Sequence, residues 1–283
     1  MPPALVALLV GATCIALSPI FVRLADVGPT ASAFWRVALA APVLWPLAAL
    51  APRPGAWRAS WPLLVAAGFA FAGDLAFWHW SIRFTSVANS TLLANLAAPF
   101  VTLALWLFWR QRPSRLFALG LGTALVGVAM LVHTSLSSSA TALLGDTLGV
   151  VTAVFYAGYI LAVKELRDAG ARTFEVMAVS SSVTALFLLP VALASGEALW
   201  PQSVYGWLTL AGLAWISHCA GQGLIAYSLA HLPAAFSSVS LLFQPVMAAV
   251  FGWLLLAERL VPLQISGGVI VLVGIYLARR ASA

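Results

Sequence analysis

Long apolar runs alternate with short polar connections along the whole chain. Each run is close to the roughly 20 residues that an α-helix needs to cross a bilayer. Ten such runs predict ten transmembrane helices, at residues 4–22, 30–50, 62–82, 86–109, 115–133, 145–164, 173–194, 204–228, 233–256 and 261–278. Because these runs use most of the chain, we expect no separate soluble domain.

A stretch of the first half returns in the second half. LANLAAPFVTLAL and SLLFQPVMAAVFG align without gaps when Pro99 is placed on Pro245. We therefore divide the chain into two repeats of five helices, residues 1–140 and 141–283. Since five is an odd number, the second repeat must enter the membrane from the opposite side. Inverted-topology repeats of this kind are associated with alternating access around a site near the midplane of the membrane.

Composition and charge agree with a membrane protein. Hydrophobic residues make up 63% of the 283 positions and charged residues 8%, against roughly 25% charged residues in soluble domains. With the N-terminus in the cytoplasm, the cytoplasmic face collects these basic residues: Arg53, Arg58, Arg110, Arg112, Arg115, Lys164, Arg167, Arg172, Arg279 and Arg280. The outer face keeps Arg23, Arg83 and Arg259. This positive-inside bias predicts that both termini are cytoplasmic, and it explains the net charge of +6 without nucleic-acid binding.

Ionisable residues inside the predicted helices are candidates for function, because an unpaired charge in the membrane is costly. Asp74 could tie helices together, contact the amino group of a substrate, or carry a coupling proton. His79 and His218 fit either structural hydrogen bonding or a proton relay. For Arg36, two interpretations stay open: it reaches the outer interface or pairs with Asp26, or it faces a cavity and attracts an anionic group.

Polar stripes and prolines mark helices four and nine. Thr91 and Asn95 begin one stripe, and Gln244 ends another. Trp78 follows Asp74 by four residues, on the same helix face, where it could stack on an aromatic ligand. Pro99 and Pro245 interrupt the helix hydrogen bonds at equivalent positions. They suit hinges, cavity-lining carbonyl groups, or simple packing bends.

Motifs typical of enzymes do not occur in this sequence. We find no GxSxG, HExxH, CxxC, GxxxxGK[ST] or GxGxxG pattern. The four histidines lie on well-separated segments, so their spacing does not predict a metal site. We therefore expect no catalytic residues, no metal and no cofactor, and no ATP-binding domain in this chain.

Two stretches make the chain resemble the EamA branch of the drug/metabolite transporter superfamily. They are TSVANSTLLANLAAPFV in helix four and LLFQPVMAAVFGWLLLAERLVPLQISGGVIVLVGIYL in helices nine and ten. The AERL step at residues 257–260 is the most specific part; the first repeat has RQRP there, at residues 110–113. The stretch GDLAFWHWSIRFTSVANSTLLANLAAPF is most similar to aromatic amino-acid exporters of the bacterial inner membrane.

The resemblance implies a central cavity surrounded by helices one, three, four, six, eight and nine. On those helices, the candidate substrate-binding residues are Asp74, Trp78, His79, Asn95, Tyr156, Tyr159, His218, Gln222 and Gln244. The implied function is alternating-access export of small amphipathic metabolites, chiefly aromatic and other amino acids, within the lipid bilayer of the inner membrane. The alternatives are proton antiport of other metabolites or drugs, a membrane enzyme acting on lipid-like substrates, and a membrane assembly protein that does not transport.

Overall fold

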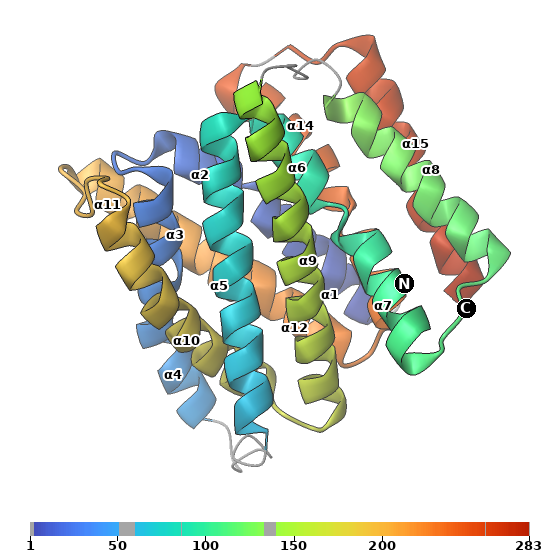
Figure 1. Cartoon of the computed structure of the whole chain (residues 1–283), viewed down its shortest axis with the longest axis horizontal. Helices are drawn as coiled ribbons and strands as arrows, with labels where there is room; N and C mark the ends of the chain where they lie inside the picture. The colour runs from blue at the N-terminus through green and yellow to red at the C-terminus, as the bar shows by residue number, and fades with distance from the viewer. Residues whose placement is uncertain (1–2, 51–59, 86, 133–139, 258, 283) are drawn as a thin grey trace.

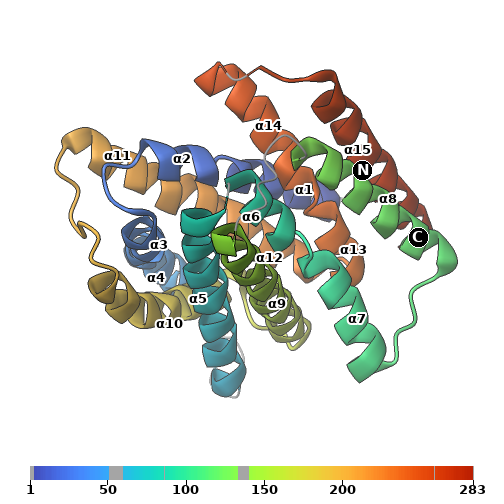
Figure 2. The ribbon, with the colours of Figure 1, turned by 45° about the horizontal axis from the view of Figure 1, so that its top comes forward.

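The computed structural model describes residues 3–50, 60–85, 87–132, 140–257 and 259–282. Every element in these ranges is a helix, and the helices pack into a bundle (Figures 1 and 2). Within the described ranges, nine helical segments are long and apolar enough to cross a membrane: Pro3–Leu24, Pro29–Ala49, Trp61–Phe84, Ser90–Trp109, Ala142–Asp168, Thr173–Ala194, Val204–Leu229, Ala234–Leu256 and Pro262–Ser282. The protein is therefore an all-helical, multi-pass membrane protein.

The predicted spans fall into continuous and interrupted helices. The continuous ones are α5 (Trp61–Phe84), α8 (Arg115–Val132), α9 (Ala140–Asp168), α10 (Thr173–Ala194) and α15 (Pro262–Ser282). The interrupted ones are α1 (Pro3–Ala16) with α2 (Ser18–Leu24), α3 (Pro29–Ala38) with α4 (Ala41–Ala49), α6 (Val87–Ala94) with α7 (Ala97–Trp109), α11 (Val204–Gly212) with the π-helix η3 (Leu213–Gln222) and α12 (Gly223–Leu229), and α13 (Ala234–Ser240) with α14 (Phe243–Leu256).

Helix α8 occupies the place of the fifth predicted span. Its apolar part, Arg115–Leu131, is shorter than the nine spans above. Each of the ten predicted ranges thus contains a helix, while the inverted repeat stays a prediction. Three residues of the sequence argument lie outside the described residues. They are Arg53 and Arg58 of the charge pattern and Glu258 of the AERL step.

The two repeat-related prolines sit just after equivalent breaks. Pro99 is the third residue of α7 and Pro245 the third residue of α14. The carbonyl oxygen of Asn95 accepts a hydrogen bond from Ala98 N at 3.3 Å, and that of Leu241 accepts one from Gln244 N at 2.9 Å. Each carbonyl group therefore accepts a hydrogen bond within the turn and is not left free by its proline.

Helices α8 and α15 approach each other through glycines. A Cβ atom on Gly120 would lie 2.8 Å from Gly274 O, and one on Gly127 would lie 2.6 Å from Gly267 O. Side chains at these positions would collide with the neighbouring backbone, so only glycine permits this separation. The pairing also runs in opposite directions, because the earlier glycine of α8 meets the later glycine of α15.

Two carboxylates join the loop before α3 to the loop before α11. Glu197 accepts hydrogen bonds from Thr30 N at 2.8 Å, Ala31 N at 3.1 Å and Thr30 Oγ1 at 3.0 Å. Asp26 accepts hydrogen bonds from Gln202 N at 3.1 Å, Ser203 N at 3.0 Å and Ser203 Oγ at 2.8 Å. Each carboxylate thus lies at the positive N-terminal end of a helix from the other half of the chain.

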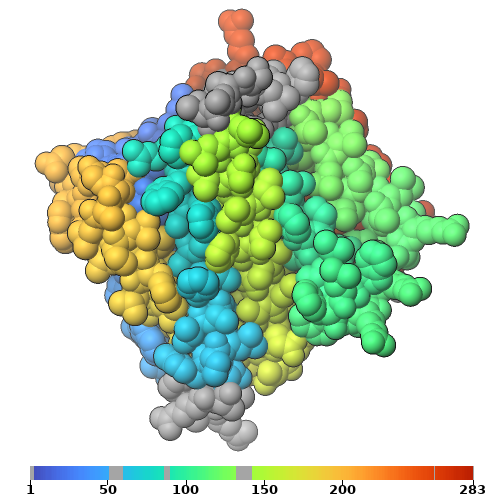
Figure 3. Space-filling model, in the orientation of Figure 1, coloured from blue at the N-terminus to red at the C-terminus, as the bar shows by residue number. Residues whose placement is uncertain are grey.

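The outer surface is apolar over much of its area. Phe108, Leu186 and Val204 are each more than 70% exposed, as expected for side chains that face lipid rather than water. Helices α5 and α9 pack against each other and lie together on the face shown in Figure 3. These two helices therefore form one outer wall of the bundle.

Candidate functional site

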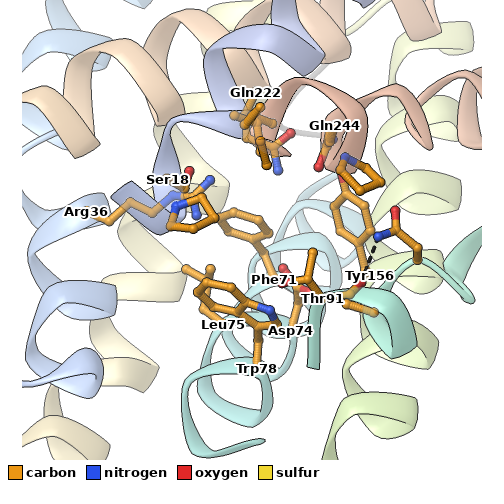
Figure 4. Close-up of a pocket in the computed structure, with 17 residues that line it drawn as sticks. Ser18, Arg36, Phe71, Asp74, Leu75, Trp78, Thr91, Tyr156, Gln222 and Gln244 are labelled. Carbon is orange, nitrogen blue, oxygen red and sulfur yellow. Dashed lines mark hydrogen bonds between the residues drawn. The ribbon is translucent and has the colours of Figure 1, made fainter. Parts of the chain in front are cut away.

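A cavity lies inside the bundle between both halves of the chain (Figure 4). Its volume is about 110 Å³. The lining residues are Ile15, Ala16, Ser18, Pro19, Arg36, Phe71, Asp74, Leu75, Trp78, Thr91, Ala94, Asn95, Tyr156, Gln222, Gln244, Pro245 and Ala248.

Helix α5 supplies one wall of the cavity. Phe71, Asp74, Leu75 and Trp78 all line it, and their spacing of i, i+3, i+4 and i+7 places them on one face of a helix. The wall therefore combines one carboxylate with two aromatic rings. The sequence analysis singled out Asp74 and Trp78, and the same helical spacing would also have found Phe71.

The second half of the chain supplies two of the amide groups, and Asn95 of the first half supplies the third. Gln222 is the last residue of η3, and Gln244 is the second residue of α14. Both lie next to the hydroxyl group of Tyr156, which comes from α9. A π-helix within a longer helix often marks a functional site, and the apolar pattern of residues 204–228 gave no sign of it.

Six of the nine candidate residues line the cavity, and three lie behind it. Tyr159 and His218 are covered by Phe71, whose ring centroid is 4.7 Å from that of Tyr159 and 5.3 Å from that of His218. Ser181 Oγ lies 2.8 Å from His218 Nε2, and Tyr159 donates to Met177 Sδ at 3.8 Å. These two side chains support the wall from behind and are not among the lining residues.

His79 points away from the cavity. Its Nδ1 atom lies 2.6 Å from Leu75 O, one helical turn earlier, and its ring meets that of Trp78 edge to face at 4.8 Å. The side chain is 1% exposed. His79 therefore holds the position of Trp78 rather than contacting the cavity itself.

Arg36 enters the cavity from α3. This agrees with the interpretation in which it faces a cavity, one of the two that the sequence left open. It is 6% exposed and lies with its guanidinium carbon 5.8 Å from the centre of the Phe71 ring. The interpretation that it reaches the interface or pairs with Asp26 is wrong, since Asp26 binds the start of α11 instead. Arg36 is the functional candidate that our list of nine lacked.

Several polar groups of the lining have no protein partner. Among the described residues, the buried atoms Ser18 Oγ, Arg36 Nε, Gln222 Oε1 and Gln244 Nε2 make no hydrogen bond. Arg36 and Asp74 likewise form no ion pair within this part of the chain. Because unsatisfied buried polar groups are costly, this lining is arranged for water or for a ligand.

Most of the cavity lies toward one end of the bundle. Ser18, Trp78 and Ala248 lie in the later parts of their spans, and Thr91 lies in the early part of the next one. These positions are all closer to the end of the bundle formed by Leu24, Phe84 and Leu256. Toward the opposite end the centre is packed by apolar residues that include Leu8, Val101, Val163 and Leu229, each no more than 1% exposed.

The cavity carries no constellation for metal chemistry in the residues that the structure describes. Within those ranges, no group of three or more His, Cys, Asp or Glu side chains is placed to hold an ion. The chemistry available is therefore hydrogen bonding, charge pairing and aromatic contact.

A multi-pass bundle with a partly polar central cavity is consistent with a small-molecule transporter. The family model of the EamA-like transporter family matches residues 2–133 and again residues 143–280. The chain therefore belongs to this family, and this membership supports a membrane transporter of small metabolites.

Individual relatives agree with this assignment at low identity. The chain is 27% identical over 212 residues to the pseudopaline exporter CntI of Pseudomonas aeruginosa, covering 75% of this chain and 72% of the exporter. It is 27% identical over 228 residues to a probable amino-acid metabolite efflux pump of Salmonella typhimurium, covering 76% of each. A solved crystal structure superposes with a TM-score of 0.83 at 15% identity, covering 99% of this chain and 98% of the other, which shows the shared fold.

Proposed function

We propose that this protein exports small amphipathic metabolites, with aromatic and other amino acids as the first candidates, across the bacterial inner membrane. The observation that carries the proposal is the central cavity, open toward one end of the bundle and packed toward the other. Its aromatic rings, amides and charges suit a ligand that is partly apolar and partly polar. The efflux pump of Salmonella typhimurium, named for amino-acid metabolites, is a relative that supports this substrate class.

Alternating access between two inverted repeats is the proposed mechanism. The same family model matches each half of the chain, and the pairing of Gly120 with Gly274 and of Gly127 with Gly267 supports an internal two-fold axis. In such a pairing, equivalent positions exchange roles across the axis. If the termini are cytoplasmic, as the charge pattern predicts, the end of the bundle toward which most of the cavity lies is the outer end, which corresponds to an outward-facing arrangement.

The rival functions have less support from the site. A non-transporting assembly protein would be expected to have a packed centre between α5, α6, η3 and α14, where the cavity lies. An enzyme acting on lipid-like substrates would need polar groups clustered at headgroup depth, whereas Asp74 lies in the middle of a 24-residue helix. Proton antiport of other metabolites or drugs is a second candidate because Asp74 faces the cavity.

Transport by the purified protein tests the proposal. Proteoliposomes should be loaded with labelled tryptophan, phenylalanine or threonine, and efflux compared with protein-free liposomes. We expect efflux of at least the aromatic amino acids above the protein-free background. If none of the amino acids crosses faster than in empty liposomes, the proposed substrate class is wrong.

A further inference from the structure

Two opposite charges face the same cavity without forming a pair. Arg36 enters from α3 and Asp74 from α5, and both line the space that also contains Trp78 (Figure 4). Each is close enough for its charge to act on the other. Even so, neither makes an ion pair or a hydrogen bond to another side chain in the described part of the chain.

This arrangement is costly unless something in the cavity compensates for it. A single charge in the interior of a membrane protein normally pairs with a partner or faces water. Arg36 is 6% exposed and Ser18 4% exposed, and both direct unpartnered atoms into this region. Gln222, at 2% exposed, adds a further unpartnered oxygen. These three polar side chains are therefore more than nine-tenths buried, and each keeps an atom without a partner.

We propose that the cavity binds a zwitterion, with a carboxylate held by Arg36 and Ser18 and an ammonium group held by Asp74. A guanidinium group matches a carboxylate with two parallel hydrogen bonds, and an aspartate accepts hydrogen bonds from an ammonium group. A ligand that carries both groups pairs with the buried Arg36 and with Asp74 at once. This inference rests on the proposed function, and it assigns the head group of the amino acid to named residues.

The remainder of the cavity defines the rest of the ligand. Trp78 follows Asp74 by one helical turn, and Phe71 precedes it by almost one turn. Leu75 and Ile15 complete an apolar surface next to the charges. Aromatic rings favour offset or edge-to-face contact with other rings, so the site suits α-amino acids with apolar or aromatic side chains. A simple amine or a simple carboxylic acid would leave one of the two protein charges without a partner.

Binding of three matched ligands tests the assignment. L-tryptophan carries both groups, tryptamine lacks the carboxylate, and indole-3-propionate lacks the amine. Affinities should be measured by competition with labelled tryptophan, or directly by calorimetry, for the purified full-length protein in nanodiscs. We expect tryptophan to bind roughly 10- to 100-fold more tightly than either analogue, the range typical of one hydrogen bond to a charged group.

Substitutions then assign each group to its residue. In Arg36→Gln, tryptophan should bind no more tightly than tryptamine, whereas in Asp74→Asn it should bind no more tightly than indole-3-propionate. Lys164→Gln and Asp168→Asn serve as matched controls, because they remove the same charges from the pair at the end of α9, and they should bind like wild type. If Arg36→Gln does not fold, Arg36→Lys retains the charge and should keep the preference for a carboxylate.

The outcomes separate this inference from the function on which it rests. Equal affinity of wild type for tryptophan and tryptamine, or an equal loss for all three ligands in each variant, would overturn the zwitterion assignment while amino-acid efflux persists. Absence of both binding and efflux for every amino acid would overturn the proposed function and this inference with it.

Discussion

Asp26 and Glu197 make reciprocal contacts across the chain. Asp26, in the loop before α3, binds the start of α11, and Glu197, in the loop before α11, caps α3. Glu197 binds the first turn of α3 through three hydrogen bonds. Asp26 binds Gln202 and Ser203, the two residues directly before α11. The two contacts join residues more than 160 positions apart. Together they fix the ends of α2, α3 and α11 to one another at the end of the bundle toward which the cavity opens.

Removing Glu197 should destabilise the protein more than removing its exposed ion-pair partner. Glu197→Ala leaves two backbone N–H groups of α3 without an acceptor, which should cost about 1–2 kcal/mol. Arg83 lies 3.6 Å from the same carboxylate, but its side chain is 46% exposed. Arg83→Ala should therefore cost less than about 1 kcal/mol. Thermal unfolding in detergent measures both, and an equal loss in the two variants would contradict the capping role.

The glycine contact between α8 and α15 makes a prediction with a control on the same helix. A Cβ atom on Gly120 would lie 2.6 Å from the backbone nitrogen of Ala278, whereas one on Gly122 would meet nothing within 4 Å. Overpacking of this kind typically costs about 1–3 kcal/mol, so Gly120→Ala should lower the melting temperature. Gly122→Ala should leave it unchanged or raise it. Similar behaviour of the two variants would mean that the helices separate easily.

Protons and substrate should compete for Asp74. Only the carboxylate form of Asp74 pairs with an ammonium group, so affinity for tryptophan should be full at high pH and fall as pH decreases. The ionisable neighbours Arg36, Tyr156 and Tyr159 do not ordinarily change charge between pH 5 and 8. We therefore expect the pH dependence to disappear in Asp74→Asn.

Histidine variants provide the control for that measurement. His79 and His218 lie behind the cavity wall, and an ordinary histidine titrates near neutral pH. His79→Gln and His218→Gln should keep the pH dependence of wild type. Efflux with and without an imposed pH gradient then shows whether the competition couples transport to protons. A pH dependence that survives in Asp74→Asn would place the proton on another group.

Pro99 and Pro245 should influence the rate of transport more than the affinity. Both lie three residues into a helix that follows a two-residue break, where half-helices can pivot. Pro99→Ala and Pro245→Ala should lower the maximal efflux rate while the affinity for tryptophan changes little. Pro190→Ala, which removes a proline inside the unbroken helix α10, is the matched control. An effect confined to affinity would mean that these prolines only shape the site.

Membrane orientation can be tested with single cysteines. Gln202 is exposed in the loop before α11, and Gln111 is exposed between α7 and α8. In a background where Cys14 and Cys219 are replaced by alanine, a membrane-impermeant maleimide applied to intact cells should label Gln202→Cys. Gln111→Cys should react only after the cells are opened. The reverse pattern would place the termini outside and make the present cavity inward-facing.

The sequence predicted helices better than it predicted which way their side chains face. The run 173–194 coincides with α10, and the breaks before Pro99 and Pro245 lie where those prolines predict them. The direction in which Arg36 points was not predictable, because four consecutive residues of α3, Thr30 to Ala33, are all buried, so burial does not follow one face of this helix. Its direction depends on how α3 packs against α10, and so on residues far away in the sequence.

The candidate site shows the same limit. Spacing along α5 placed Asp74 and Trp78 on one face, and both line the cavity. It did not reveal that Tyr159 and His218 lie one layer behind, because the ring of Phe71 covers them only in the folded bundle. The carboxylate of Glu197 likewise satisfies a helix 166 residues away, a contact without a local signal.

The glycine contact between α8 and α15 also has a consequence for folding during synthesis. Helix α8 is synthesised well before α15, the last helix in the sequence. Until α15 is inserted, the glycine face of α8 has no helix to fit against it. Native assembly therefore cannot finish during synthesis of the first half, and α8 must remain available as the docking surface that the final helix completes.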